Sequence, residues 1–350
     1  MKVLVVGANG LVGSAAVDSF REGGWDVIGM SRRPSTAERH LSVDLRDAAA
    51  TRDAATRLKG VTHVVYAAVH EMPGLVAGWR DDRQMAANLE MFRNLLDNLN
   101  EVEHVTLLQG AKAYGVHRHP IRIPAREREP RDDHPNFYWL QEDHLRASGL
   151  AWTILRPQLI VGPTYGVAMN LPPVIGAYAA LCRYLGRPFA FPGGAPYVTE
   201  AVDVRLVANA ARWAATNKQA WGETYNLTNG EVFAWRDLWP AIADELGMPT
   251  APDEPLRLAK WLPAQATAWD DLVREHNLRR IPLADLLGES HHYADFHFAY
   301  GAQHAPPPAL MSTVKIKQAG FAQVMDTEES MRHWLRTLID QRILPYAPGS

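Results

Sequence analysis

A tyrosine near the middle of the chain, Tyr138, is surrounded by residue types that could do acid–base chemistry. Its phenol can donate a hydrogen bond to a developing oxyanion, and a nearby positive charge favours its ionised form. The residue one helical turn later is Glu142, and a carboxylate there acts in the opposite direction. Either the segment has no catalytic role or the positive charge comes from elsewhere. Lys112, within residues 107–115, is the candidate for that charge.

The amino-terminal segment has the order of elements that a bound dinucleotide requires. Residues 3–6 are apolar and rich in β-branched types, residues 7–13 read Gly-x-x-Gly-x-x-Gly, and residues 14–22 are helix-like. A strand, a glycine turn and a helix in that order bring a pyrophosphate close to the free N–H groups of the helix N-terminus. The sequence therefore predicts a dinucleotide site, with turn contacts from Gly7, Asn9, Gly10, Leu11, Val12 and Gly13.

The end of the second predicted strand, residues 25–30, indicates which dinucleotide binds. The strand runs into Ser31, Arg32 and Arg33, with no acid to hold a ribose 2′-hydroxyl, whereas arginine accommodates a 2′-phosphate. This favours NADP(H), although a pair of solvated surface arginines has the same sequence pattern.

Another predicted strand, residues 40–43, leads to Asp44 and Leu45. We expect Asp44 to accept from the adenine amino group. A helix N-cap role for Asp44 or Asp47 fits the pattern equally well.

The elements that must position these residues alternate along the chain. Strand-like stretches are predicted at residues 62–66, 104–108 and 151–155, and helices at 84–99 and 138–147. This βα alternation predicts an α/β fold, a Rossmann-type doubly wound parallel sheet with ligands at the carboxyl ends of its strands. Further cofactor contacts are therefore expected from Ala67, Ala68, Gln109, Lys112, Tyr138, Pro157 and Ile160.

The pattern becomes proline-rich and aromatic after Pro157, with a late strand at residues 223–227. We interpret residues 1–157 as an NADP(H)-binding core that includes the lysine and the tyrosine. Residues 158–350 are interpreted as mainly a smaller substrate-covering lobe, with late strands and helices that return to the core.

The composition is that of an ordinary globular protein. The 350 residues are 47% hydrophobic with a formal net charge of −3, which gives no indication of a nucleic-acid or membrane partner. The single cysteine, Cys182, excludes an intramolecular disulfide, and the first predicted strand starts directly after Met1 and Lys2. We therefore expect a cytoplasmic protein. His117, His119, His291 and His292 lack the accompanying ligands that a zinc site requires, so no metal is expected.

Several blocks along the chain together resemble the progesterone 5β-reductase/iridoid synthase family of extended short-chain dehydrogenases. They include the glycine motif, the arginine pair, residues 61–66, 91–97, 110–114, 136–143, 156–157, 169–171 and 178–180. The resemblance implies NADPH-dependent reduction of enones, with Lys112 and Tyr138 as the catalytic pair and with Met169 and Asn170 near the substrate. The loop after Lys112 is longer than in the plant enzymes, and it puts Ile121 near the place of a pocket-lining phenylalanine.

The displaced lysine favours 1,4- over 1,2-reduction. Hydride addition to the β-carbon of an enone or enal leaves an enolate, which requires a preorganised donor at the oxygen while the proton goes to carbon and can come from water. One alternative is a nucleotide-sugar epimerase or carbonyl dehydrogenase of the same superfamily, and another is a non-catalytic NADP(H)-binding sensor. The expected partner is a small-molecule enone or enal, and a homodimer is expected only because that state is common.

Overall fold

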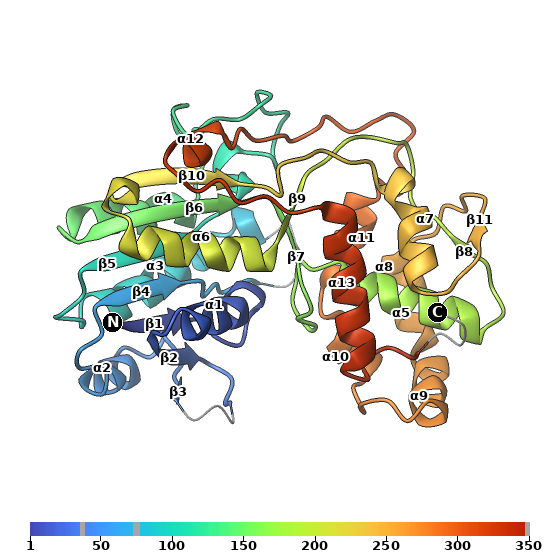
Figure 1. Ribbon diagram of the computed structural model, residues 1–350, viewed down its shortest axis with the longest axis horizontal. Coiled ribbons are helices and arrows are strands. Elements are labelled where there is room, and N and C mark those ends of the chain that lie inside the picture. Colours follow the sequence, from blue (N-terminus) through green and yellow to red (C-terminus); the bar gives the residue numbers. More distant parts are fainter. Residues whose placement is uncertain (36–38, 73–77, 347–350) are drawn as a thin grey trace. The chain divides into compact units, whose positions relative to one another are not determined.

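Six short strands within residues 2–157 and one late strand at residues 223–227 pair into one parallel sheet (Figure 1). The computed structural model describes residues 1–35, 39–72 and 78–346. Within them, seven strands pair in the order β10-β6-β5-β4-β1-β2-β3, and every neighbouring pair is parallel. The strands are β1 (Lys2–Val6), β2 (Asp26–Ser31), β3 (His40–Ser42), β4 (His63–Tyr66), β5 (His104–Leu108), β6 (Ala151–Pro157) and β10 (Glu223–Leu227). The predicted doubly wound parallel sheet is confirmed.

Helices cover both faces of this sheet, which explains why inner strands such as β1 and β4 are largely apolar and buried. The helices α1 and α6 pack on each other on one face, and α3 lies between α2 and α4 on the other (Figure 1). Leu4, Val105 and Ile154 are fully buried in the core between these layers. The helices are α1 (Leu11–Glu22), α2 (Ala48–Thr56), α3 (Asp82–Leu96), α4 (Phe137–Ala147), α6 (Val204–Thr216) and α12 (Val314–Gln318), with short 3₁₀ turns η1 (Gly78–Arg80), η2 (Ala111–Tyr114) and η3 (Lys218–Ala220).

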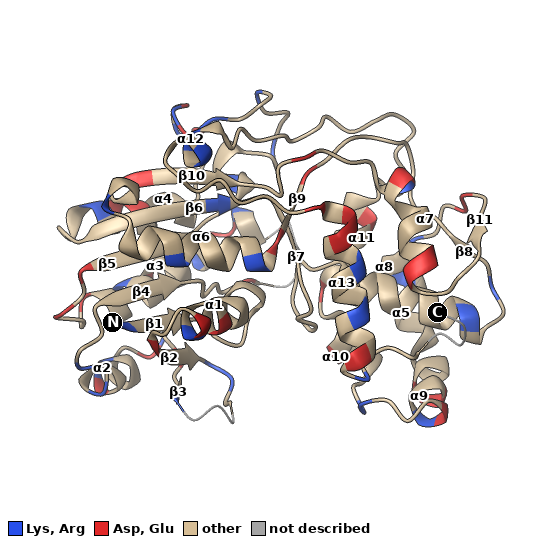
Figure 2. Ribbon diagram, in the orientation of Figure 1, with Lys and Arg blue, Asp and Glu red and all other residues tan. Residues whose placement is uncertain are grey.

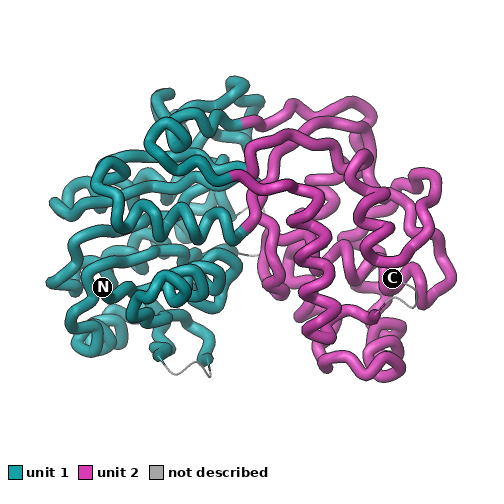
Figure 3. The backbone as a smooth tube through the Cα atoms, in the orientation of Figure 1, with its two compact units in different colours: residues 1–158, 204–228, 311–323 teal, residues 159–203, 229–310, 324–350 magenta. Residues whose placement is uncertain are grey.

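The chain divides into two compact units (Figure 3). The first contains residues 1–158, 204–228 and 311–323, and therefore holds the whole parallel sheet. Helix α6 and strand β10 belong to this unit although they follow the 159–203 segment in sequence. Strand β10 extends the sheet at the edge beside β6, with Glu223 opposite Thr153.

The second unit contains residues 159–203, 229–310 and 324–350, and it is mainly helical. Its aromatic core includes Trp239, which stacks on Phe189 with ring centroids 4.7 Å apart. The buried Asp203 carboxylate accepts from the Trp334 indole N–H at 3.1 Å, joining β9 to α13. Its elements are β7 (Leu159–Val161), α5 (Pro172–Tyr184), β8 (Phe189–Ala190), β9 (Ala201–Asp203), α7 (Trp235–Glu245), β11 (Thr250–Ala251), α8 (Leu258–Trp261), η4 (Pro263–Gln265), α9 (Ala266–Glu275), α10 (Leu283–Leu287), α11 (Ser290–His297) and α13 (Thr327–Asp340).

Basic and acidic residues are interspersed in both units (Figure 2). None of the helices in the described part of the chain is both long enough and apolar enough to span a bilayer.

Candidate active site

The residues that could bind a ligand or take part in catalysis lie at the carboxyl ends of four neighbouring strands in the first unit. Strand β1 ends at the glycine turn, β4 at Ala67, β5 at Gln109 and β6 at Pro157. The chain runs from β1 to β2 and β3 on one side of β1, and then crosses to β4 on its other side. In sheets of this kind the crevice beside such a switch point is where ligands bind.

The glycine turn is built so that a ligand can approach the backbone. Gly7 has a φ of +84°, and a Cβ there would lie 2.9 Å from the Ala67 carbonyl. A Cβ on Gly13 would clash with the Gly7 carbonyl oxygen. Gly10 precedes α1 without a side-chain cap, and the described first turn of α1 contains no acid. The N–H groups and positive dipole of α1 therefore suit an anion, and this cradle fits the pyrophosphate of a dinucleotide.

The loop after β2 presents its arginines to solvent. The Asn9 amide donates to the Arg33 carbonyl at 3.0 Å, and the Ser31 hydroxyl donates to the same carbonyl at 2.8 Å. The Ser42 hydroxyl holds the Arg32 carbonyl at 3.1 Å. The backbone is thus fixed while the Arg32 and Arg33 side chains remain exposed.

Asp44 interacts closely with a neighbouring arginine. Arg46 forms a forked pair with its carboxylate, with Nη2 2.6 Å from Oδ2 and Nε 3.0 Å from Oδ1. The Arg46 hydrogen bond lowers the pKa of Asp44 to about 2. Asp47 caps α2, accepting from Ala49 and Ala50. Leu45 is buried.

Lys112 lies in η2, directly after β5, with its ammonium over an indole ring. Its Nζ is 3.9 Å from the centroid of Trp79, a side chain that is 3% exposed. Burial lowers the pKa of Lys112 to about 8, and the Glu71 carboxylate acts to raise it. The Glu71 carboxylate also accepts from the Trp79 indole N–H at 3.2 Å. Lys112 can therefore change its protonation state near neutral pH.

Tyr138 is held at the first turn of α4 against the same indole. The Asn136 side chain caps the helix by accepting from the Tyr138 N–H at 3.0 Å, and its amide donates to the Lys112 carbonyl at 3.2 Å. The Tyr138 and Trp79 rings meet edge to face with centroids 5.2 Å apart. A Cβ on Gly110 would lie 3.4 Å from the Tyr138 hydroxyl, so a glycine there leaves space beside that group. Trp79 thus contacts both members of the predicted pair.

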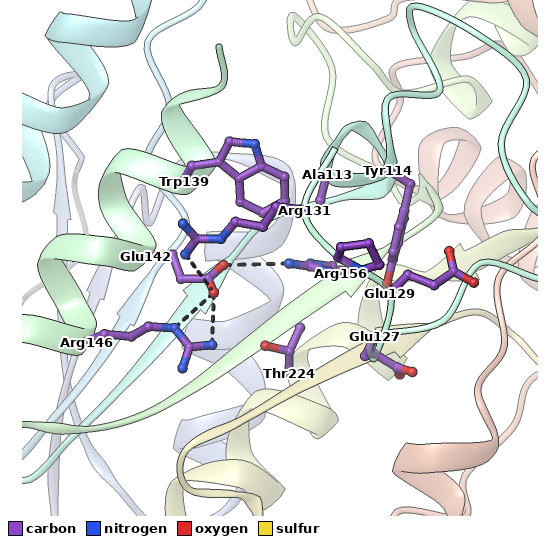
Figure 4. A pocket seen from close by; sticks show the side chains of 11 residues that line it. Ala113, Tyr114, Glu127, Glu129, Arg131, Trp139, Glu142, Arg146, Arg156 and Thr224 are labelled. Carbon is purple, nitrogen blue, oxygen red and sulfur yellow. Dashed lines mark hydrogen bonds and ion pairs between the residues drawn. The ribbon is translucent and has the colours of Figure 1, made fainter. Parts of the chain in front are cut away.

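Glu142, one helical turn after Tyr138, lies among three arginines (Figure 4). Its Oε1 is 3.1 Å from Arg131 Nη2 and 2.9 Å from Arg146 Nη2, and its Oε2 is 3.6 Å from Arg156 Nη2. Burial acts to raise the pKa of Glu142, and the arginines, Arg131 foremost, hold it below its usual value. The carboxylate therefore stays ionised, and its negative charge is balanced by the guanidinium groups around it.

Gln109 connects this cluster to Tyr138. Its amide N–H₂ donates to the Glu142 carboxylate at 3.2 Å and to the Tyr138 carbonyl at 3.3 Å, and its carbonyl accepts from Arg156 Nε at 2.9 Å. These contacts fix α4 to the ends of β5 and β6. Gln109 was predicted to contact the cofactor, and the structure shows its amide in this network.

A polar cavity of about 260 Å³ adjoins the arginine cluster (Figure 4). Arg156 lies between the rings of Tyr114 and Trp139, at 5.2 and 5.5 Å from their centroids. Tyr114 in turn donates to the Asn226 side chain at 2.7 Å. Glu127, Glu129 and Thr224 also line the cavity.

A second group of polar side chains follows η2. His117 lies against Trp79 and His134, with ring centroids 6.1 and 5.2 Å away. Burial lowers the pKa of His117 to about 4, so the imidazole is neutral at pH 7. Asp132 lies between His134 Nδ1 at 2.6 Å and His119 Nε2 at 2.9 Å. Within the described ranges no set of three or more His, Cys, Asp or Glu side chains is arranged to hold a metal ion.

The residues predicted near the substrate fall in both units. Ile121, in the first unit, is half-buried against Ala111, Tyr114, Ala125 and Met311. Met169 and Asn170 belong to the second unit, as does Ile160, which was predicted to contact the cofactor.

Asn170 is fully buried and bonded to its own unit. Its amide donates to the Gly162 carbonyl at 2.8 Å and the Thr164 carbonyl at 2.7 Å, and its carbonyl accepts from the Gly162 N–H.

Sequence reasoning missed three residues that surround the predicted pair. Trp79 and Glu71 follow β4 in a stretch with no periodic pattern, and Asn136 was predicted only as part of the 136–143 block that contains Tyr138. The helix cap had a detectable signal, because an asparagine directly before an apolar helical stretch is a preferred N-cap. A lone tryptophan gives no such signal, since large aromatics usually pack in cores.

Comparison with known proteins places the chain in a family. A family model described as the NAD dependent epimerase/dehydratase family matches residues 3–228. An (S)-8-oxocitronellyl enol synthase of Antirrhinum majus is 29% identical, covering 98% of this chain and 92% of the relative. Another from Nepeta cataria is 30% identical, covering 98% and 91%. These relatives confirm the resemblance to the iridoid synthase group.

A solved structure shares the fold. A short-chain dehydrogenase/reductase superfamily protein from Agrobacterium tumefaciens, with bound NAD, has a TM-score of 0.65 at 19% identity and covers 98% of both chains. The family model covers more than half of the sequence. The chain therefore belongs to the NAD dependent epimerase/dehydratase family, a group of extended short-chain dehydrogenases.

Proposed function

We propose that this protein is an NADPH-dependent reductase of the activated C=C bond of enones or enals. The supporting observation is that Lys112 and Tyr138 lie against one indole ring while Glu142 is neutralised by arginines. A buried ammonium and a phenol hydroxyl beside Gly110 can stabilise negative charge on a carbonyl oxygen. The similarity to enol synthases over 98% of the chain supports the same class of substrate.

The cofactor would be held by the glycine turn and the exposed arginines. Gly7, Gly10 and the N-terminus of α1 would receive the pyrophosphate, and Arg32 and Arg33 would receive a 2′-phosphate. The bound nicotinamide would supply the hydride. Ala67, Gly110 and Pro157 lie at the carboxyl ends of β4, β5 and β6, on the same edge of the sheet as the glycine turn.

The residues of the chain act on the carbonyl oxygen of the substrate. As a C–H bond forms at the β-carbon, the C=C electron pair shifts and negative charge develops on the oxygen as an enolate. Tyr138 donates a hydrogen bond to this oxygen, and the Lys112 ammonium stabilises the charge; one such donor is often worth ~3 kcal/mol. The enolate then takes a proton at the α-carbon from water, which gives the saturated ketone or aldehyde.

In this proposal Ile121, in the loop after η2, contributes to substrate selectivity. Ile121 packs beside Tyr114 and can shape the approach to Lys112. Met169 remains a proposed substrate contact. Asn170 donates hydrogen bonds to Gly162 and Thr164, and these support the fixing of the segment after β7 as its main role.

The decisive experiment follows NADPH absorbance with 2-cyclohexen-1-one and identifies the product by gas chromatography with mass spectrometry. Formation of cyclohexanone supports the proposal. Formation of 2-cyclohexen-1-ol instead would assign a carbonyl reductase. Tight NADPH binding without turnover of this or other enones and enals would favour a sensor. Interconversion of UDP-glucose and UDP-galactose would favour an epimerase.

A further inference from the structure

The indole of Trp79 packs against both members of the predicted catalytic pair. Trp79 is 3% exposed, and its ring face carries the Lys112 ammonium at 3.9 Å. It also contacts the two aromatic residues that begin α4, at 4.7 Å from Phe137 and 5.2 Å from Tyr138. An ammonium over an indole face is attracted by the ring quadrupole, most strongly where water is excluded.

The indole is itself held by a carboxylate. Trp79 Nε1 donates to Glu71 Oε1 at 3.2 Å, which fixes the plane of the ring. The same carboxylate acts on Lys112 through space, in the direction that favours the ammonium. Glu71 therefore affects the lysine in two ways, by orienting its aromatic support and by its charge.

We propose that Glu71 and Trp79 are positioning residues that keep the Lys112 side chain charged and directed at Tyr138. This inference rests on the proposed reductase function, because it assigns Lys112 a role in turnover. The competing explanation is that Trp79 is a packing residue only. In that case replacement of the indole by another apolar side chain would leave the Lys112 titration unchanged.

The charges around Lys112 make Glu71 the informative residue to change. Two other titratable groups are near Lys112. His117, in the segment after η2, is neutral at pH 7, and Tyr138, on α4, packs on the same indole. The other groups that act on His117 are basic: Arg80 of η1, Arg118 and His134. None of them would stabilise the Lys112 ammonium. Glu71 is the anion in this set. Removing its charge leaves the ammonium with less compensation.

The expected pH dependence follows from the sign of this effect. The ammonium is the active form, so turnover falls as pH rises through the pKa of Lys112, which burial lowers to about 8. Loss of the Glu71 charge shifts that pKa further down, because a nearby negative charge favours the ammonium. The alkaline decline of kcat then begins at lower pH.

The test uses Glu71→Gln, which keeps the side-chain shape and a hydrogen-bond acceptor for the indole. The matched control is Glu90→Gln, an exposed carboxylate on α3. Protein labelled with ¹³Cε-lysine contains seven lysines, and the Lys112 resonance is assigned by its loss in Lys112→Arg. The resonance is titrated by NMR in each variant, and kcat for 2-cyclohexen-1-one is measured over the same pH range.

We expect the Lys112 titration and the alkaline limb of kcat to move together to lower pH in Glu71→Gln and to stay in place in Glu90→Gln. The limb should disappear in any active Lys112→Arg protein, because arginine does not titrate in this range. Trp79→Phe, which keeps a ring and removes the N–H, should shift the titration less than Trp79→Leu. An unmoved Lys112 titration in Glu71→Gln overturns the inference even if the enzyme reduces enones. Absence of any enone reduction by the wild type, with the titration shifted, instead overturns only the proposed function.

Discussion

Tyr138 and Glu142 are one turn apart on α4, yet their side chains enter different surroundings. The phenol packs on Trp79 beside Gly110, and the carboxylate enters a cluster of arginines. The spacing alone suggested that the acid would oppose ionisation of the phenol. The guanidinium groups remove most of that opposition, because they neutralise the carboxylate within ion-pair distance. The charge of one residue therefore does not determine the electrostatic potential at its neighbour when the other residues close in space are unknown.

Replacement of Tyr138 by phenylalanine should reduce enone turnover by roughly ten- to a thousandfold, the range expected when one oxyanion donor is lost. NADPH affinity should change little, because the glycine turn and the arginines hold most of the cofactor in the proposed mode. Residual activity should survive with strongly activated enones. The measurement is kcat and KM with 2-cyclohexen-1-one alongside NADPH binding by fluorescence.

Lys112→Ala should lower kcat as well, and the double variant should lose less than the product of the two effects. Both groups act on one developing charge, so their contributions are coupled. Wild-type rates in all three variants would remove Tyr138 and Lys112 from the mechanism.

At the scale of elements, the site depends on how α4 is fixed to the sheet. Gln109 at the end of β5 and Arg156 in β6 both contact Glu142 on α4, and Asn136 ties the helix start to η2. The alternation of apolar strands and helices predicted these elements, and the strands at His104–Leu108 and Glu223–Leu227 have the predicted bounds. The polar ties between elements were not predictable, because they depend on side chains far apart in sequence.

Glu142→Lys should destabilise the protein by roughly 3–5 kcal/mol, because it removes a buried partner and adds a fourth cation to the cluster. It would restore the Tyr-x-x-x-Lys spacing, but in the Lys112→Ala background it should not restore activity, since the new ammonium would face Arg131, Arg146 and Arg156. Urea unfolding gives the stability change. Glu90→Lys on the exposed face of α3 serves as the control and should change stability by less than about 0.5 kcal/mol. A stable Glu142→Lys protein would contradict the assigned role of the cluster.

The loop after β2 should set cofactor choice. Replacing Arg32 and Arg33 together by alanine should raise the KM for NADPH by roughly ten- to a hundredfold, the effect of losing charge-assisted hydrogen bonds to a phosphate. Use of NADH should change little, because it has no 2′-phosphate. Initial rates with each cofactor test this. Equal efficiency of NADPH and NADH in the wild-type protein would show that the arginines are ordinary surface charges.

At the scale of the whole molecule, burial that builds the sheet also fixes the charge state of histidines inside it. His104 at the start of β5 is 1% exposed and stacks on Trp221 with centroids 5.3 Å apart. Thr153 donates its hydroxyl proton to the Ala220 carbonyl at 2.7 Å, so it accepts from His104 Nε2 at 2.9 Å. Burial foremost, with His63 nearby, lowers the pKa of His104 to about 3. The imidazole therefore stays neutral in the folded protein.

This makes stability depend on pH in a defined direction. The unfolded chain takes up a proton at His104 near pH 6.5, whereas the folded chain does not until about pH 3, so stability is full above 6.5 and falls as pH drops through that window. One such histidine costs ~1.4 kcal/mol for each pH unit below 6.5. Between pH 7.5 and 5.5 the wild type should therefore lose ~1.4 kcal/mol more than His104→Gln, even though the variant is less stable at both values because its packing on Trp221 is lost. Urea unfolding at the two pH values measures this difference, with the exposed His276→Gln as the control. If His104→Gln loses as much stability as the wild type, protonation of His104 is not coupled to unfolding, and the acid sensitivity arises from other groups.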